Sequence, residues 1–157
     1  MKSIQRAHIV VVADSDQGLL LAARLLRMDV ARVTTVASLD EAGGLCRAGG
    51  ADACIVAFDD ALPDAVPAAE KDAPGRGTGI PTLMIVGAVT PYTRRVARRH
   101  GYLAAVPASI SPRMLYRRIS AALQWRRAAS RGWHRPAIGA LIAGFERPGA
   151  FGNPTLH

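Results

Sequence analysis

The sequence contains few aromatic residues, few cysteines and no long apolar run. Two Trp, three Tyr and three Phe are the only aromatic residues among 157, so Ala, Val, Leu and Ile must build the core. No apolar run approaches the roughly 20 residues that a membrane span requires, and the first six residues show no export signal. Cys46 and Cys54 lack CxxC and metal-ligand spacing, which predicts reduced thiols and a cytoplasmic location.

Lysine is also scarce, because it occurs only at Lys2 and Lys71, yet the formal net charge is +8. Nearly all of the positive charge is therefore arginine. A GC-rich genome would produce the same bias towards arginine and alanine. The functional explanation of this positive charge is attraction to an acidic partner. A high isoelectric point gives information about such partners, not about the fold.

Five short apolar runs alternate with segments in which leucine and alanine recur at helical spacing. The runs predict strands over residues 8–13, 32–36, 53–58, 80–87 and 102–106. The intervening segments predict helices over residues 17–28, 38–48, 91–100 and 112–129, with at most a short helix around 65–71. Ser38 and Glu41 resemble a capping box at the start of the second helix. Gly49 is expected to end that helix in the left-handed conformation.

This alternation of strands and helices with short connections predicts an α/β fold with a parallel sheet covered on both faces. The specific expectation is a flavodoxin-like, doubly wound, five-stranded parallel sheet with strand order 2-1-3-4-5. Residues 1–129 would form this domain. Residues 130–157 are rich in Gly and Pro and predict a mostly flexible tail, whose apolar stretch 137–145 could alternatively dock on the domain or a partner.

Acidic side chains follow two strands that are neighbours in this strand order. Asp14 and Asp16 come after the first strand, and Asp59 and Asp60 come after the third. Carboxylates that converge at strand ends form an oxygen site suited to Mg²⁺, and one of them could accept a phosphoryl group. The alternative is structural, because Asp at a strand-to-helix junction is often only a helix N-cap.

From about residue 6 to residue 128, the chain resembles the response-regulator receiver family. In that family the first strand ends in an acidic pair, and the third ends in a phosphate-accepting Asp with Pro four residues later. Asp14 matches the second acid, with Ala13 at the first position. Asp59 matches the acceptor, because it lies 45 residues after Asp14 and four before Pro63, and Asp60 is the second candidate.

The alignment at the acceptor is not unique. An alignment anchored on Asp52 would place Ala57 at the acceptor position instead of Asp59. With Asp59 as the acceptor, the resemblance implies a metal site made by Asp14 and Asp59, at which we expect Mg²⁺ to bind weakly or not at all.

Two other positions depart from the family pattern. Val86 stands where the family has Thr or Ser at the end of the fourth strand. The motif that opens the last helix places Ala108 and Ser109 at the family's Lys-Pro position, and no lysine follows Lys71. Losing a charge-assisted contact at such a site costs about 1.5–3 kcal/mol. The site would thus lack its usual means of reporting phosphorylation to the rest of the domain.

The last two helices are strongly basic. In receivers the helix before the fifth strand, that strand and the final helix form the usual partner surface. The residues expected at this surface are Arg94, Arg95, Arg98, Arg117, Arg118 and Tyr116. Arginine and aromatic residues favour a protein partner or a homodimer. A solvated face is the simpler alternative. Nucleic acid is less favoured, because no helix-turn-helix pair follows the domain.

The leading functional hypothesis is a stand-alone, atypical receiver that acts in signal transduction by binding another protein, independently of phosphorylation and without catalytic turnover. Its partner would be a histidine kinase or a downstream regulator of a two-component system. The main alternative is a phospho-accepting response regulator of a phosphorelay, in which Asp59 receives the phosphoryl group and Asp14 holds Mg²⁺. A basic nucleic-acid-binding regulator is a third hypothesis.

Overall fold

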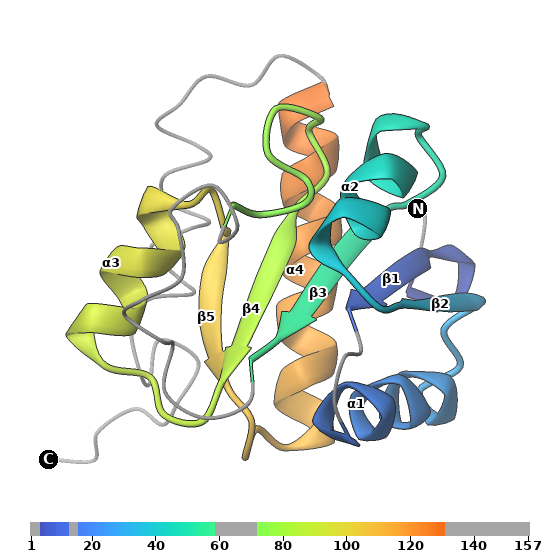
Figure 1. Ribbon diagram of the computed structural model, residues 1–157. Helices are drawn as coiled ribbons and strands as arrows, with labels where there is room; N and C mark the ends of the chain where they lie inside the picture. The colour runs from blue at the N-terminus through green and yellow to red at the C-terminus, as the bar shows by residue number, and fades with distance from the viewer. Residues whose placement is uncertain (1–3, 13–15, 59–71, 131–157) are drawn as a thin grey trace, which may run out of the picture.

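A parallel five-stranded sheet organises the protein (Figure 1). The computed structural model describes residues 4–12, 16–58 and 72–130. The strands are β1 (His8–Val12), β2 (Arg32–Val36), β3 (Ala53–Ala57), β4 (Thr82–Val86) and β5 (Ala104–Pro107). Their order is β2-β1-β3-β4-β5, and each neighbouring pair is parallel. The predicted fold class and strand order are confirmed.

Helices cover both faces of the sheet, as the alternating pattern requires. After a short 3-10 turn, η1 (Ile4–Arg6), the helices are α1 (Asp16–Arg27), α2 (Leu39–Arg47), α3 (Pro91–Arg99) and α4 (Pro112–Ser130). The core on one face contains residues of α1 and α4, and the core on the other contains residues of α2 and α3. Within the described residues, no helix is long and apolar enough to cross a membrane. The short helix predicted around 65–71 and almost all of the predicted tail lie outside the described residues.

The buried strands explain the continuous apolar runs of the sequence. β3 and β4 are buried at every position, because they lie inside the sheet with helices on both faces. On α1 the buried face carries Leu21 and Leu25, whereas Leu19, Leu20 and Leu26 are 57–65% exposed. The leucine spacing therefore predicted the helix correctly, although three of these leucines lie outside the core.

Both helix-boundary signals around α2 have a local physical cause. The Ser38 side chain accepts a hydrogen bond from the Glu41 backbone N–H at 3.2 Å, which confirms Ser38 as the N-cap. The Glu41 carboxylate accepts from the N–H of Ala37 at 3.4 Å, one residue before the N-cap that a full capping box would use. Gly49 has φ +74°, the left-handed conformation expected after the helix.

Strand β5 starts two residues later than predicted. The Tyr102 backbone N–H donates to the Ala97 carbonyl at 2.9 Å and so completes the end of α3. The chain reaches the sheet at Leu103, whose N–H donates to the Thr82 carbonyl at 2.8 Å. The predicted strand over 102–106 is therefore replaced by Ala104–Pro107.

The start of α3 is held by a complete capping box. The Thr90 side chain accepts from the Thr93 N–H at 3.2 Å, the Thr93 hydroxyl accepts from the Thr90 N–H at 2.8 Å, and Pro91 occupies the first turn. We expect Thr90→Ala to lower the free energy of unfolding by about 1 kcal/mol, because an N–H at the helix start loses its acceptor. Urea denaturation would measure this change. Thr90→Ser keeps the hydroxyl and should retain most of the stability; equal losses in both variants would contradict the capping explanation.

Candidate functional site

The carboxyl ends of the strands meet at one edge of the sheet, where parallel α/β proteins place their chemistry. The register sets Val12 of β1 level with Val56 of β3, and Val86 of β4 level with Pro107 of β5. Phe58, just after β3, donates its N–H to the Ile85 carbonyl of β4 at 2.9 Å. The residues that follow β1, β3, β4 and β5 therefore begin at the same edge of the sheet.

The acidic residues predicted for this edge lie mostly outside the described residues. Asp14, Asp59 and Asp60 belong to that undescribed group, so the structure gives no geometry for the predicted acceptor or metal site. Asp16 is described, and it is an exposed residue in the first turn of α1. Within residues 4–12, 16–58 and 72–130, no three His, Cys, Asp or Glu side chains converge as a metal site would require.

The positions that carry the hydroxyl and the lysine in the receiver family are adjacent in space. The Ala108 N–H donates a hydrogen bond to the Val86 carbonyl at 2.7 Å. Val86 is 3% exposed and aliphatic, and Ala108 packs against the core through its methyl group. Neither side chain can donate a hydrogen bond or carry charge, so neither can make the contact with a phosphoryl group that the family's hydroxyl and lysine make.

An aromatic pair, of which Tyr102 is buried and Phe58 half-buried, lies beside the end of β3. Phe58 and Tyr102 pack edge to face, with ring centroids 6.3 Å apart and an interplanar angle of 73°. Burial raises the pKa of the Tyr102 hydroxyl, because the charged phenolate is less favourable away from water. Among the described residues, that hydroxyl has no hydrogen-bond partner.

Asp52, the alternative alignment anchor, lies at the opposite edge of the sheet. One of its carboxylate oxygens accepts from the His8 N–H at 2.8 Å, and the other forms an ion pair with Arg126 of α4. An alignment anchored on Asp52 would assign the acceptor position to Ala57, which is the last residue of β3 and 3% exposed.

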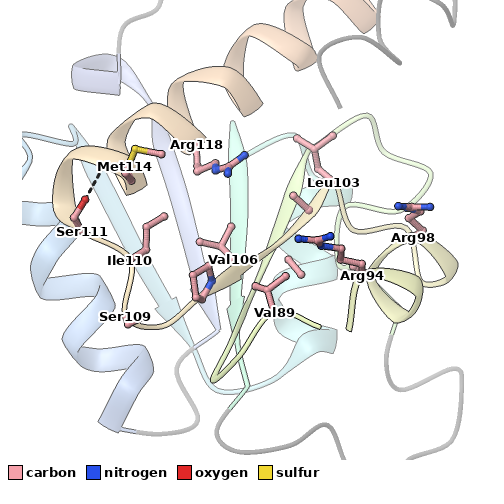
Figure 2. Close-up of a pocket in the computed structure, with 14 residues that line it drawn as sticks. Val89, Arg94, Arg98, Leu103, Val106, Ser109, Ile110, Ser111, Met114 and Arg118 are labelled. Carbon is pink, nitrogen blue, oxygen red and sulfur yellow. Dashed lines mark hydrogen bonds between the residues drawn. The ribbon is translucent and has the colours of Figure 1, made fainter. Parts of the chain in front are cut away.

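A groove lies between α3 and α4 and runs over β5 (Figure 2). Its volume is about 550 Å³. Leu103, Val106 and Ile110 contribute apolar surface, and Met114 adds the α4 wall. The hollow arises because β5 presents short side chains at Ala104 and Ala105. We call this cavity the α3–α4 groove.

Three of the six predicted interface residues line the α3–α4 groove. Arg94 and Arg98 lie on its α3 side and Arg118 on its α4 side, as Figure 2 shows. The others, Arg95, Arg117 and Tyr116, are exposed but do not line it. Sequence reasoning identified the basic face and missed its apolar centre, because that centre depends on residues 89–118 folding around a short strand.

Among the described residues that line the groove, every charged side chain is an arginine. Residues 73–130 contain ten arginines and no Asp or Glu. No carboxylate occurs among the described residues that line the groove. Burial lowers the pKa of the Arg118 guanidinium, because a partly desolvated cation is less favourable than a solvated one. An anionic group placed in the groove would offset this cost.

Comparison with known proteins reveals similarity in structure alone. No family model matches the chain, and no curated protein matches its sequence. A CheY-like response-regulator receiver domain protein from Methanospirillum hungatei JF-1 shares 18% identity over 78% of this chain and 98% of its own, with a TM-score of 0.59. The signal receiver domain of an HD domain-containing protein from Pseudomonas fluorescens Pf-5 shares 15% identity over 81% and 93%, with a TM-score of 0.64.

A candidate pilus assembly-related protein from Burkholderia pseudomallei K96243 is also similar, with 20% identity over 79% of this chain and 94% of its own and a TM-score of 0.64. At sequence identities this low, the similarity establishes the fold alone. The protein has the fold of a response-regulator receiver domain, with the strand order 2-1-3-4-5 of that fold. Within that fold, this chain carries Val86 and Ala108 where the resemblance places a hydroxyl and a lysine.

Proposed function

We propose that the protein is an atypical receiver that acts in signal transduction by binding a protein partner, independently of phosphorylation. The observation that carries this proposal is the contact between Val86 and Ala108, whose backbone groups are hydrogen-bonded at 2.7 Å. A phosphoryl group shifts a two-state equilibrium only if it interacts differently with the two states. With aliphatic side chains at both positions, the domain lacks the phosphoryl contacts that would stabilise one of the two states over the other.

The α3–β5–α4 face is the proposed partner surface. It combines arginines with Met114 and Tyr116 of α4, and Arg, Met and Tyr are residue types enriched at protein interfaces. Similarity to receiver domains supports a role in a two-component system, with a histidine kinase or a downstream regulator as partner. A homodimer through the same face is a competing arrangement, and sedimentation of the purified chain would reveal it.

The phosphorylation hypothesis is tested directly with a phosphoryl mimic. We expect Mg²⁺ with beryllofluoride to leave hydrogen–deuterium exchange of residues 87–99 unchanged, because Val86 and Ala108 cannot transmit occupancy of the site to the segment that follows β4. Mass spectrometry of the peptides from this segment would measure the exchange. Asp59→Asn is the matched control, since it removes the proposed acceptor.

The second candidate function is a phospho-accepting response regulator, which is favoured by the common edge at which β1 and β3 end. It predicts a Mg²⁺-dependent change in exchange that Asp59→Asn abolishes. That result would reject phosphorylation independence. Weak Mg²⁺ binding without an effect on residues 87–99 would instead agree with the proposed function.

A further inference from the structure

The α3–α4 groove has the size and surface of a binding site for a bulky apolar group. Its volume of about 550 Å³ lies within the range of roughly 300–1,000 Å³ typical of ligand pockets. Val89, Leu103, Val106 and Met114 line it with aliphatic or thioether groups. A methionine wall adapts to different shapes, because its side chain is unbranched and flexible. An apolar group that binds here would be removed from water, and Met114 could adjust its shape to that group at a modest cost in conformational energy.

The arginines at the rim of the groove favour a ligand with negative charge. Arg94 and Arg98 approach from α3, and Arg118 approaches from α4, so guanidinium groups flank the apolar centre on two sides (Figure 2). Arg94 and Arg118 are half-buried and Arg98 is exposed. Guanidinium groups bind carboxylates through paired hydrogen bonds, which strengthen as water is excluded.

We propose that the α3–α4 groove binds a segment of a partner protein in which one bulky apolar side chain is flanked by carboxylates. This inference rests on the proposed function, since it specifies the chemistry of the partner. The apolar side chain fills the centre over β5, and the flanking carboxylates pair with the arginines of α3 and α4.

A second copy of the chain fits this groove less well. A two-fold dimer places the same patch on both subunits. Here that would bring arginine against arginine, and like charges facing each other across an interface oppose association. Nucleic acid would satisfy the arginines through phosphates. It would leave the aliphatic centre without a complementary group, because a phosphate backbone carries no apolar side chain.

The test uses a short fluorescein-labelled peptide with one phenylalanine between glutamates, titrated with the full-length protein and followed by fluorescence anisotropy. A matched peptide has lysine at every glutamate position, and a second has serine for phenylalanine. We expect binding of the glutamate peptide at low salt, weaker binding at high salt, and weaker binding of both matched peptides. The salt response reports the arginines, and the serine peptide reports the apolar centre.

Variants of the protein locate the binding site. Arg94→Glu and Arg98→Glu should each weaken binding of the glutamate peptide by about tenfold or more, because each replaces attraction by repulsion. Arg27→Glu changes the net charge equally on α1, outside the groove, and should change affinity by less than about twofold. Met114→Ala should weaken binding without altering the salt response. Thermal melts of all variants separate loss of binding from loss of folding. Because Arg98 is exposed, Arg98→Glu is less prone than Arg94→Glu to disturb the fold.

Three outcomes overturn the proposal: no binding of the glutamate peptide at low salt, equal binding of the lysine peptide, or equal loss from Arg27→Glu and Arg94→Glu. Two further results would also overturn it by assigning the groove to another occupant. These are self-association, or binding to a DNA or RNA oligonucleotide, that Arg94→Glu abolishes. None of these results decides phosphorylation independence, which depends on the beryllofluoride experiment.

Discussion

Gly75→Ala is expected to destabilise the protein by about 3 kcal/mol or more, because the added methyl group would collide with backbone. A Cβ built at Gly75 lies 1.9 Å from the Ile80 carbonyl oxygen and 2.8 Å from the Thr82 hydroxyl oxygen. The Ile80 oxygen cannot rotate away, since it belongs to the main chain. Urea denaturation would measure the loss in free energy of unfolding.

The loss should be large because the turn before β4 is anchored at Gly75. The Gly75 N–H donates to the buried Thr82 hydroxyl at 3.2 Å, and the Gly75 carbonyl accepts from the Thr78 N–H at 3.0 Å. Moving Gly75 outwards would break the first of these bonds and leave the Thr82 hydroxyl, which is 1% exposed, short of a partner.

Gly44→Ala is the matched control for this substitution. Gly44 lies inside α2, and a Cβ built there meets nothing within 4 Å. Alanine in a helix interior should therefore stabilise the protein by about 0.5–1 kcal/mol. The two glycine-to-alanine changes are expected to have opposite signs. A loss at Gly75 no larger than about 1 kcal/mol would mean that the turn can relax and that the close approach has little consequence.

The architecture was predictable because each element has a local signal that agrees with the global fold. The apolar runs that became β3 and β4 had to be buried on both faces, and such strands occur in parallel sheets covered by helices. Ser38 and Gly49 marked the limits of α2 through hydrogen bonding and backbone conformation, which are properties of single residues. Boundaries set by distant contacts were less accurate, as the late start of β5 shows.

The candidate site was only partly predictable. The absence of a hydroxyl at Val86 and of a lysine at Ala108 could be predicted from alignment with the receiver pattern, and the structure places these residues in contact. The α3–α4 groove could not be predicted, because a cavity forms where the side chains of neighbouring elements leave space, and this depends on the tertiary structure. Ala104 and Ala105 leave that space only when α3 and α4 lie on either side of β5.

The role of Asp52 was also beyond sequence reasoning, because Arg126 lies 74 positions further along the chain. Arg126 sits near the C-terminal end of α4, while Asp52 directly precedes β3. Their ion pair connects the last helix to the amino edge of the sheet. The Asp52 N–H donates to the His8 carbonyl at 2.8 Å, and its carboxylate accepts from the His8 N–H at the same distance. Asp52 thus joins β1, β3 and α4.

Asp52→Ala is expected to lower the free energy of unfolding by about 2–4 kcal/mol, because it removes the acceptor of a strand N–H and the partner of a guanidinium. The Asp52 side chain is only 11% exposed, so water cannot fully replace these bonds, whereas Arg126, at 31%, can turn towards solvent. Arg76→Ala is the control, because it removes an arginine–aspartate ion pair whose side chains are 55% and 41% exposed and leaves the contact of Asp72 with His100 in place. That change should cost less than about 1 kcal/mol. Equal losses in urea denaturation would show that burial does not strengthen the Asp52 network, and α4 would then be held to the sheet by its apolar face alone.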